Sequence, residues 1–292
     1  MSLRLGTRGS TLALAQAEYV ATLLGNAEVV PVATEDGEPG DKSRFVRGVE
    51  RALLEGEVDL GVHSAKDLPG ELPEGLALVG VGPREDPADA FVGDATALAD
   101  LREGARVGTS SLRRRSQLLA LRADLEITDL RGNVDTRLRK LDSGELDGIV
   151  LAAAGLARLG RGESIAFRFG ADEMVPAPGQ GTLALEARAD DEAAMTAAAS
   201  VTDRQALVEL TAERAVVSVL GASCQTPVGI CARHMDGTLA LAGFAGMPDG
   251  SEWIRDAVRG DPDQPGAVAM ALLERLQSAG AGDLLERAEA AG

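Results

Sequence analysis

Residue types suited to binding an anion follow four predicted strands, at the turns where each strand leads into a helix. A helix N-terminus offers free N–H groups and the positive end of a dipole, and Ser and Thr hydroxyls add donors. Arginine adds a planar fork that matches a carboxylate or a phosphate. At one turn, helix capping and surface ion pairs would be the better explanation, but at several turns we favour a site for an anion with several negative groups. The residues are Arg8, Gly9 and Ser10, then 63–67, then 109–111 with Arg113, Arg114 and Arg115, and then 131–133 with Arg137.

Lys66 and Asp67 lie in the second of these turns. Lysine occurs only at Lys42, Lys66 and Lys140, so its presence in this turn is informative; Lys42 lies in a loop rich in Gly, Pro and Asp that could close over a cleft. A carboxylate among basic neighbours stays ionised unless it is desolvated. Asp67 could therefore stabilise a cationic intermediate or shuttle a proton. A salt bridge or a cap of the turn before Pro69 explains Asp67 equally well from its position.

The two cysteines lie in different surroundings. Cys231 is in an apolar predicted strand, where a cysteine is usually a small buried hydrophobe. Cys224 is in a loop with Ser, Gln and Gly, which packing explains less readily, so it could be a nucleophile or an attachment site. With two Cys and two His in the chain, we expect neither a disulfide framework nor a metal site.

The composition limits the classes of partner. The 292 residues carry a formal net charge of −17, which disfavours a nucleic acid or an anionic membrane surface as a partner. No apolar run is long enough to predict a membrane span, and residues 1–6 predict a strand without a signal-peptide pattern. We therefore expect a cytoplasmic monomer. The acidic, lysine-poor and aromatic-poor composition fits adaptation to high cytosolic salt, and GC-rich codon usage explains it equally well.

Short apolar runs alternate with helical patterns, which is typical of parallel sheets with crossover helices. Two patterns occur twice in the same order: Arg-Xaa-Gly-Thr at 4–7 and 106–109, and Gly-Glu-Xaa-Asp at 56–59 and 144–147. Two similar halves explain both repeats better than chance does. We therefore predict an α/β fold in which two similar doubly wound domains, like those of periplasmic binding proteins, flank a cleft and precede a small C-terminal α/β domain.

Further element boundaries follow from the same patterns. Segments that contain proline predict crossings between the halves, and one more strand then rejoins the first half. The crossings are expected at 82–87 and 176–179, strands at 58–62 and 182–187, and a long helix at 203–220. The expected domains are 1–82 plus 182–200, then 87–176, and then 203–292, which carries Cys224.

Seven segments, in order along nearly the whole chain, resemble the porphobilinogen deaminase family, also called hydroxymethylbilane synthases. Any one of them would be weak evidence, whereas seven in family order are highly specific. The segments are RGSTLALAQ at 8–16, HSAKDLP at 63–69, REDPADAF at 84–91, GTSSLRR at 108–114, DLRGNVDTR at 129–137, GQG at 179–181 and the loop around Cys224.

This resemblance implies a transferase of porphyrin biosynthesis. Such an enzyme joins four porphobilinogen molecules head to tail, loses ammonia at each step and releases hydroxymethylbilane. The resemblance implies a dipyrromethane primer held by a thioether on Cys224, and a catalytic Asp67 that contacts pyrrole nitrogens and stabilises the positive charge formed as ammonia leaves. The implied primer-binding residues are Lys66, Ser111, Arg113, Arg114, Asn133 and Gln180. The implied pyrrole-binding residues are Arg8, Ser10, Gln16, Ser64, Arg131, Arg137 and Arg158.

The chain departs from the family pattern at the expected lid. Residues 34–45 are short and acidic, where the family usually has a longer loop with two lysines, and only Lys42 matches one of these. The alternative from another class is a non-catalytic two-domain anion-binding protein. Such a protein is normally exported and has no need of Cys224.

Overall fold

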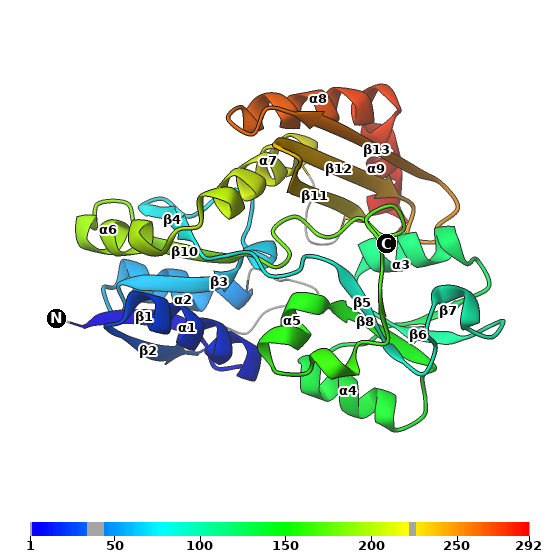
Figure 1. The fold of residues 1–292 in the computed structure, drawn as a ribbon, viewed down its shortest axis with the longest axis horizontal. Coiled ribbons are helices and arrows are strands. Elements are labelled where there is room, and N and C mark those ends of the chain that lie inside the picture. Colours follow the sequence, from blue (N-terminus) through cyan, green and yellow to red (C-terminus); the bar gives the residue numbers. More distant parts are fainter. Residues whose placement is uncertain (1, 34–43, 222–225, 292) are drawn as a thin grey trace.

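The computed structural model describes residues 2–33, 44–221 and 226–291. Its strands form three sheets, which lie beside one another with helices packed against them (Figure 1). In spatial order, the first sheet contains β2 (Ala27–Val32), β1 (Leu3–Arg8), β3 (Leu60–Ser64), β10 (Leu183–Arg188) and β4 (Leu76–Val81). The second contains β7 (Glu126–Thr128), β6 (Arg106–Gly108), β8 (Gly148–Ala152), β5 (Asp89–Gly93) and β9 (Phe167–Arg168). The third contains β11 (Val228–Met235), β12 (Thr238–Gly246) and β13 (Trp253–Gly260).

Short polar side chains begin many of the helices. The Ser10 hydroxyl accepts the N–H of Ala13, and Gly25, at φ 73°, ends the same helix in the left-handed conformation that glycine adopts most easily. The helices are α1 (Thr11–Leu24), α2 (Arg44–Leu54), α3 (Leu112–Leu121), α4 (Val134–Asp142), α5 (Ala153–Arg158), α6 (Glu192–Val201), α7 (Arg204–Leu220), α8 (Pro265–Ser278) and α9 (Ala281–Ala290). Short 3₁₀ turns are η1 (Ala65–Asp67), η2 (Leu98–Asp100) and η3 (Gly162–Ser164).

The first two sheets have the same topology, as the sequence repeats predict. In each, three parallel strands (β2-β1-β3 and β7-β6-β8) are followed by an antiparallel one, β10 or β5. The repeats also carry the same contact. The Arg4 N–H donates to the Asp59 carboxylate at 2.9 Å and the Arg106 N–H donates to the Asp147 carboxylate at 2.7 Å. The prediction of two similar doubly wound units is confirmed.

The sheets are mixed, because each contains parallel strands together with antiparallel ones. The antiparallel strands are the two that enter a sheet after the chain crosses from the other one. The segment 82–88 connects β4 to β5, and 169–182 connects β9 to β10. A strand that arrives from the opposite side runs against its neighbours. β10 is buried on both faces, with Leu183 and Leu185 in one apolar cluster and Ala184 in another.

Element boundaries agree with the predictions at some places and shift at others. The long helix is observed as α7, with Asp203 as its N-cap and Gly221 as its C-cap. The strand predicted at 58–62 is observed two residues later, at Leu60–Ser64, so His63 and Ser64 belong to the strand. Helices α6 and α9 were not anticipated.

The third sheet is antiparallel, and its two faces have different partners. Helices α7, α8 and α9 share one apolar core with β11 and β12, whereas α3 approaches the opposite face near β12. Within residues 2–33, 44–221 and 226–291, no helix combines the length and apolar character that a membrane span requires. In the same residues, no group of three or more His, Cys, Asp or Glu could hold a metal ion.

Candidate active site

Asp67 lies just beyond the carboxyl end of β3. This strand is central and buried, and η1 follows it directly, so the fold positions the turn firmly. Arg214 of α7 supports the turn by donating to the backbone oxygens of Pro69 and Gly70 at 2.9 and 2.8 Å. Because β1 and β3 are parallel neighbours, their carboxyl ends meet, and Arg8 Nη2 lies 4.0 Å from Asp67 Oδ2. The structure thus brings together two of the predicted site residues.

Gln180 connects the turns of the two main sheets. It lies in the segment 169–182, which connects β9 to β10, and is only 1% exposed. Its Oε1 lies 3.4 Å from Lys66 Nζ and 3.5 Å from Arg114 Nη2. Its Nε2 donates to the Pro87 oxygen at 2.7 Å and to Asp89 Oδ1 at 3.0 Å. A single buried amide therefore orients one cation from each half.

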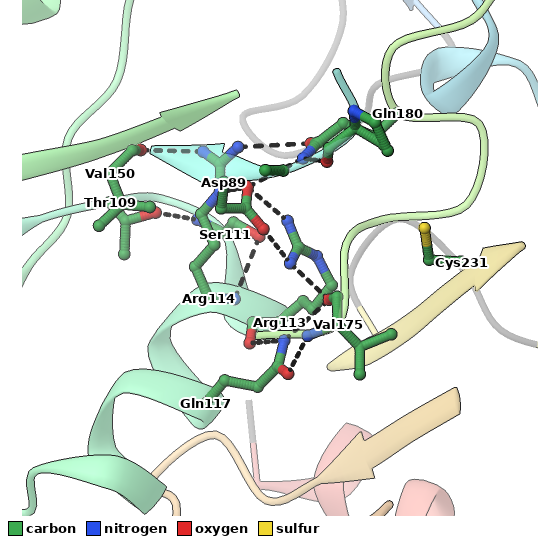
Figure 2. A network of polar contacts seen from close by, with 12 residues as sticks. Asp89, Thr109, Ser111, Arg113, Arg114, Gln117, Val150, Val175, Gln180 and Cys231 are labelled. Carbon is green, nitrogen blue, oxygen red and sulfur yellow. Dashed lines mark hydrogen bonds and ion pairs between the residues drawn. The ribbon is translucent and has the colours of Figure 1, made fainter. Parts of the chain in front are cut away.

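Arg113 and Arg114 share one buried carboxylate, Asp89 (Figure 2). Arg113 Nη1 lies 2.6 Å from Asp89 Oδ2, and Arg114 Nε lies 2.8 Å from Asp89 Oδ1. Burial opposes ionisation of Asp89, but the two guanidinium groups outweigh it and hold the pKa of this carboxyl well below its usual range. One carboxylate between two guanidinium groups leaves one positive charge in excess. This pair can therefore hold a further anion.

Replacing Asp89 by asparagine should lower the free energy of unfolding by about 3–5 kcal/mol, because two buried guanidinium groups lose their counter-charge. Urea denaturation of both proteins measures this. Asp256→Asn is the matched control, since Asp256 pairs with Arg275 at the surface, and it should change the free energy little. A loss as small as that of the control would contradict the proposed burial of the pair.

The ion pairs of Asp89 with Arg113 and Arg114 also predict that the stability of the fold depends on pH. The folded pKa of Asp89 is below its unfolded value, so its contribution to stability is complete above about pH 4 and is lost as pH falls through the folded pKa. The Asp89→Asn variant should therefore lose less stability on acidification than the parent chain does.

Two more arginines lie near the residues described above, and burial lowers the pKa of both. Burial and the charge of Arg114 together lower the pKa of Arg137 to about 10, against the attraction of Asp129 and Asp67. Burial also lowers the pKa of Arg158, which donates to the Gly181 oxygen at 2.6 Å. A depressed guanidinium pKa marks a position where an added anion would be stabilised.

The other predicted site residues have structural partners or lie elsewhere. Ser10, Ser111 and Asn133 are helix N-caps, and each side chain accepts a backbone N–H of its own helix. Arg131 pairs with Asp129 at the surface. The remaining predicted residues are Gln16, which is buried in α1, Ser64, which ends β3, and Lys42 and Cys224, which lie outside the described residues.

Sequence reasoning did not assign roles to Asp89 or Arg84. Arg84 Nη2 lies 2.8 Å from Glu213 of α7, and its Nε donates to the Gln180 oxygen at 3.1 Å. Glu213 also accepts the N–H of Gly179 at 2.6 Å. This buried contact ties α7 to the segment that carries Gln180. The sequence signal that could have indicated these roles was a charged residue beside apolar neighbours in the segment 84–91.

Cys231 is buried and makes no contact with the Asp89, Arg113 and Arg114 cluster drawn in Figure 2. Burial and the nearby Glu213 carboxylate raise the pKa of its thiol to about 11. We expect Cys231 to resist alkylation by iodoacetamide at pH 8 in the folded protein and to react after unfolding in urea, because the thiolate is the nucleophile. Peptide mapping after each treatment measures this. Equal labelling of Cys231 in both states would show that the thiol is accessible.

Comparison with known proteins places this arrangement in a family. The profile "Porphobilinogen deaminase, dipyromethane cofactor binding domain" matches residues 3–196, and "Porphobilinogen deaminase, C-terminal domain" matches 207–278. The porphobilinogen deaminase of Campylobacter concisus is 42% identical over 98% of both chains. That of Roseiflexus sp. is 45% identical over 97% of this chain and 98% of its own. Among solved structures, a TRAP periplasmic solute binding protein from Desulfovibrio salexigens is 14% identical, with a TM-score of 0.44 over 70% of this chain and 73% of that chain. Since both profiles and these relatives together span almost every residue, the chain belongs to the porphobilinogen deaminase family.

Proposed function

We propose that the chain joins four porphobilinogen molecules head to tail on a covalently bound dipyrromethane, with loss of ammonia at each step and final release of hydroxymethylbilane. One observation of the structure carries this proposal: Asp67 lies among cationic side chains contributed by both halves. Each porphobilinogen brings two carboxylates, so a growing chain needs more guanidinium groups than one phosphate would. The alternative of a non-catalytic anion-binding protein is not favoured by the family match.

The residues present fit a dipyrromethane with carboxylate side chains. Arg113 Nε is buried and has no hydrogen-bond partner among the described residues, and burial together with Arg114 lowers the pKa of Arg137. We propose that Arg113, Arg114 and Lys66 hold its carboxylates, with Gln180 orienting Lys66 and Arg114 and with Ser111 and Asn133 at the adjacent helix ends. When bound through Cys224, the dipyrromethane supplies the pyrrole carbon to which new units are added.

Asp67 would act on the substrate. A carboxylate placed beside a centre that becomes positive stabilises the transition state electrostatically. We propose that Asp67 does this as ammonia leaves, and that Arg8 keeps the carboxylate oriented from 4.0 Å. Further residues would bind the carboxylates of incoming and growing pyrroles. These are Ser10, Gln16, Ser64, Arg131, Arg137 and Arg158, with Lys42 on a lid.

The division into 1–82 plus 182–200, 87–176 and 203–292 is part of the proposal, as are a monomeric state and a cytoplasmic location. The membership of β10 in the first sheet supports the division. Size-exclusion chromatography with light scattering tests the monomer.

The assay for the proposed function uses the purified chain and porphobilinogen alone. We expect four molecules of ammonia for each linear tetrapyrrole, identified by mass spectrometry. Saturable binding of porphobilinogen without ammonia release would instead indicate the anion-binding alternative.

We also propose that the acidic surface is adapted to high salt. At a net charge of −17, repulsion within the folded chain is strong, and salt screens it. The melting temperature and the turnover at saturating substrate should both rise between low salt and about 1 M KCl, where the Debye length is roughly 3 Å. A flat salt response would favour codon bias as the origin of the composition.

A further inference from the structure

A separate pocket lies on the third sheet, on the face opposite α7, α8 and α9. Its volume is about 270 Å³. Alternation along each strand sends Ile230, Ala232 and Leu241 into the helical core, and sends their sequence neighbours to the pocket face. The pocket lining includes Ala171, Cys231, Arg233, Ala240, Ala242, Ala257 and Arg259.

The strand register explains why this pocket is open. Arg233, Ala240 and Arg259 lie directly opposite one another on the three adjacent strands. In the next row toward the second sheet, Cys231, Ala242 and Ala257 are opposed. Three alanines thus form a flat apolar floor with little side-chain bulk. The two arginines stand on either side of it, two strand spacings or roughly 10 Å apart.

The charge of this pocket is not balanced by the protein. Among the described residues, neither Arg233 nor Arg259 has a carboxylate within ion-pair distance. The Nε of Arg233 is buried and has no hydrogen-bond partner in the same part of the chain. Removing such a group from water without a partner is costly, and a carboxylate supplies the matching acceptors.

We propose that this pocket binds a small carboxylate with a flat apolar body, its charged end held by Arg233 and Arg259 and its body resting on the alanine floor. The volume suits such a ligand, because an apolar cavity of about 150 Å³ is sufficient for benzene. The pocket is separate from the candidate active site. The Sγ of Cys231, at the inner end of the pocket, lies 4.0 Å from Arg84 Nη2. Arg84 lies between Cys231 and Gln180 and donates to the Gln180 oxygen.

Phenylacetate is a suitable probe, titrated into the full-length enzyme and followed by calorimetry and by protein-observed NMR. We expect saturable binding with a Kd of about 1 mM or tighter. Arg233→Gln and Arg259→Gln should each weaken it by about tenfold, since each removes a charge-assisted hydrogen bond. Arg204→Gln is the matched control, because Arg204 is exposed at the start of α7, and it should bind as the parent does.

Two further comparisons make the test decisive. 2-Phenylethanol has the same ring without the charge and should bind at least about tenfold more weakly. Ala240→Leu fills the half-buried floor without altering either arginine, and it should abolish binding while leaving the melting temperature close to that of the parent. Absence of saturable binding would overturn the proposal. So would equal affinity for the alcohol, or affinity unchanged in both arginine variants, because either would show that the guanidinium groups do not hold the ligand.

Discussion

Replacing Asp67 by asparagine should lower turnover by about 10²–10³-fold while leaving the bound dipyrromethane in place. The amide keeps the shape of the side chain and removes the negative charge that is proposed to face the developing cation. The turn itself should persist, because Arg214 holds the backbone oxygens of Pro69 and Gly70 rather than the Asp67 side chain. Initial rates of ammonia release give the turnover, and intact-mass spectrometry reports whether the dipyrromethane is attached.

The expected split between kcat and KM distinguishes a catalytic carboxylate from a structural one. An interaction made only in the transition state lowers kcat and kcat/KM equally. The control is Asp124→Asn, since Asp124 pairs with Arg122 at the surface of the second unit, and it should keep the parent rate. Undiminished turnover in Asp67→Asn would remove Asp67 from the mechanism. A rate recovered with higher substrate concentration would reassign it to binding.

The meeting of Arg8 and Asp67 could be predicted because it depends on local patterns and one general rule. Each residue follows an apolar run with strand character, and carboxyl ends of parallel neighbours share an edge of the sheet. The two-residue shift of β3 could not be predicted in this way. Val58 is apolar and fully buried, yet it lies before the first residue of β3. Beside it, the N–H of Arg4 donates to the side chain of Asp59 and not to a backbone oxygen of a neighbouring strand. Apolar character alone does not show where strand pairing begins.

The role of Asp89 depends on contacts between distant segments. Its partners Arg113, Arg114 and Gln180 are 24, 25 and 91 positions away in the chain. The sequence shows an acidic residue before an apolar strand, and a surface aspartate would look the same. The antiparallel direction of β5 and β10 could not be predicted from the sequence either, because a buried apolar run has the same composition in either direction.

Replacing Cys224 by alanine should abolish both the attached dipyrromethane and the deaminase activity. The parent chain is expected to exceed its sequence mass by one dipyrromethane, and the variant to show the bare mass. Described residues border Cys224 on both sides in the sequence. Gly221 ends α7 at φ 63°, β11 begins at Val228, and α7 is tied to the Gln180 segment through Glu213. The described residues that border Cys224 are therefore linked to the segment that carries Gln180.

Cys231→Ala is the matched control for this experiment, because it removes the other thiol of the chain. Cys231 is 3% exposed and its thiol pKa is raised to about 11, so it is a poor candidate for attachment. This variant should keep both the added mass and the activity. Loss of the added mass in Cys231→Ala but not in Cys224→Ala would move the attachment to the buried strand. A parent chain at its bare mass with full activity would exclude covalent attachment, and the arginines around Gln180 would then have to hold the primer without a tether.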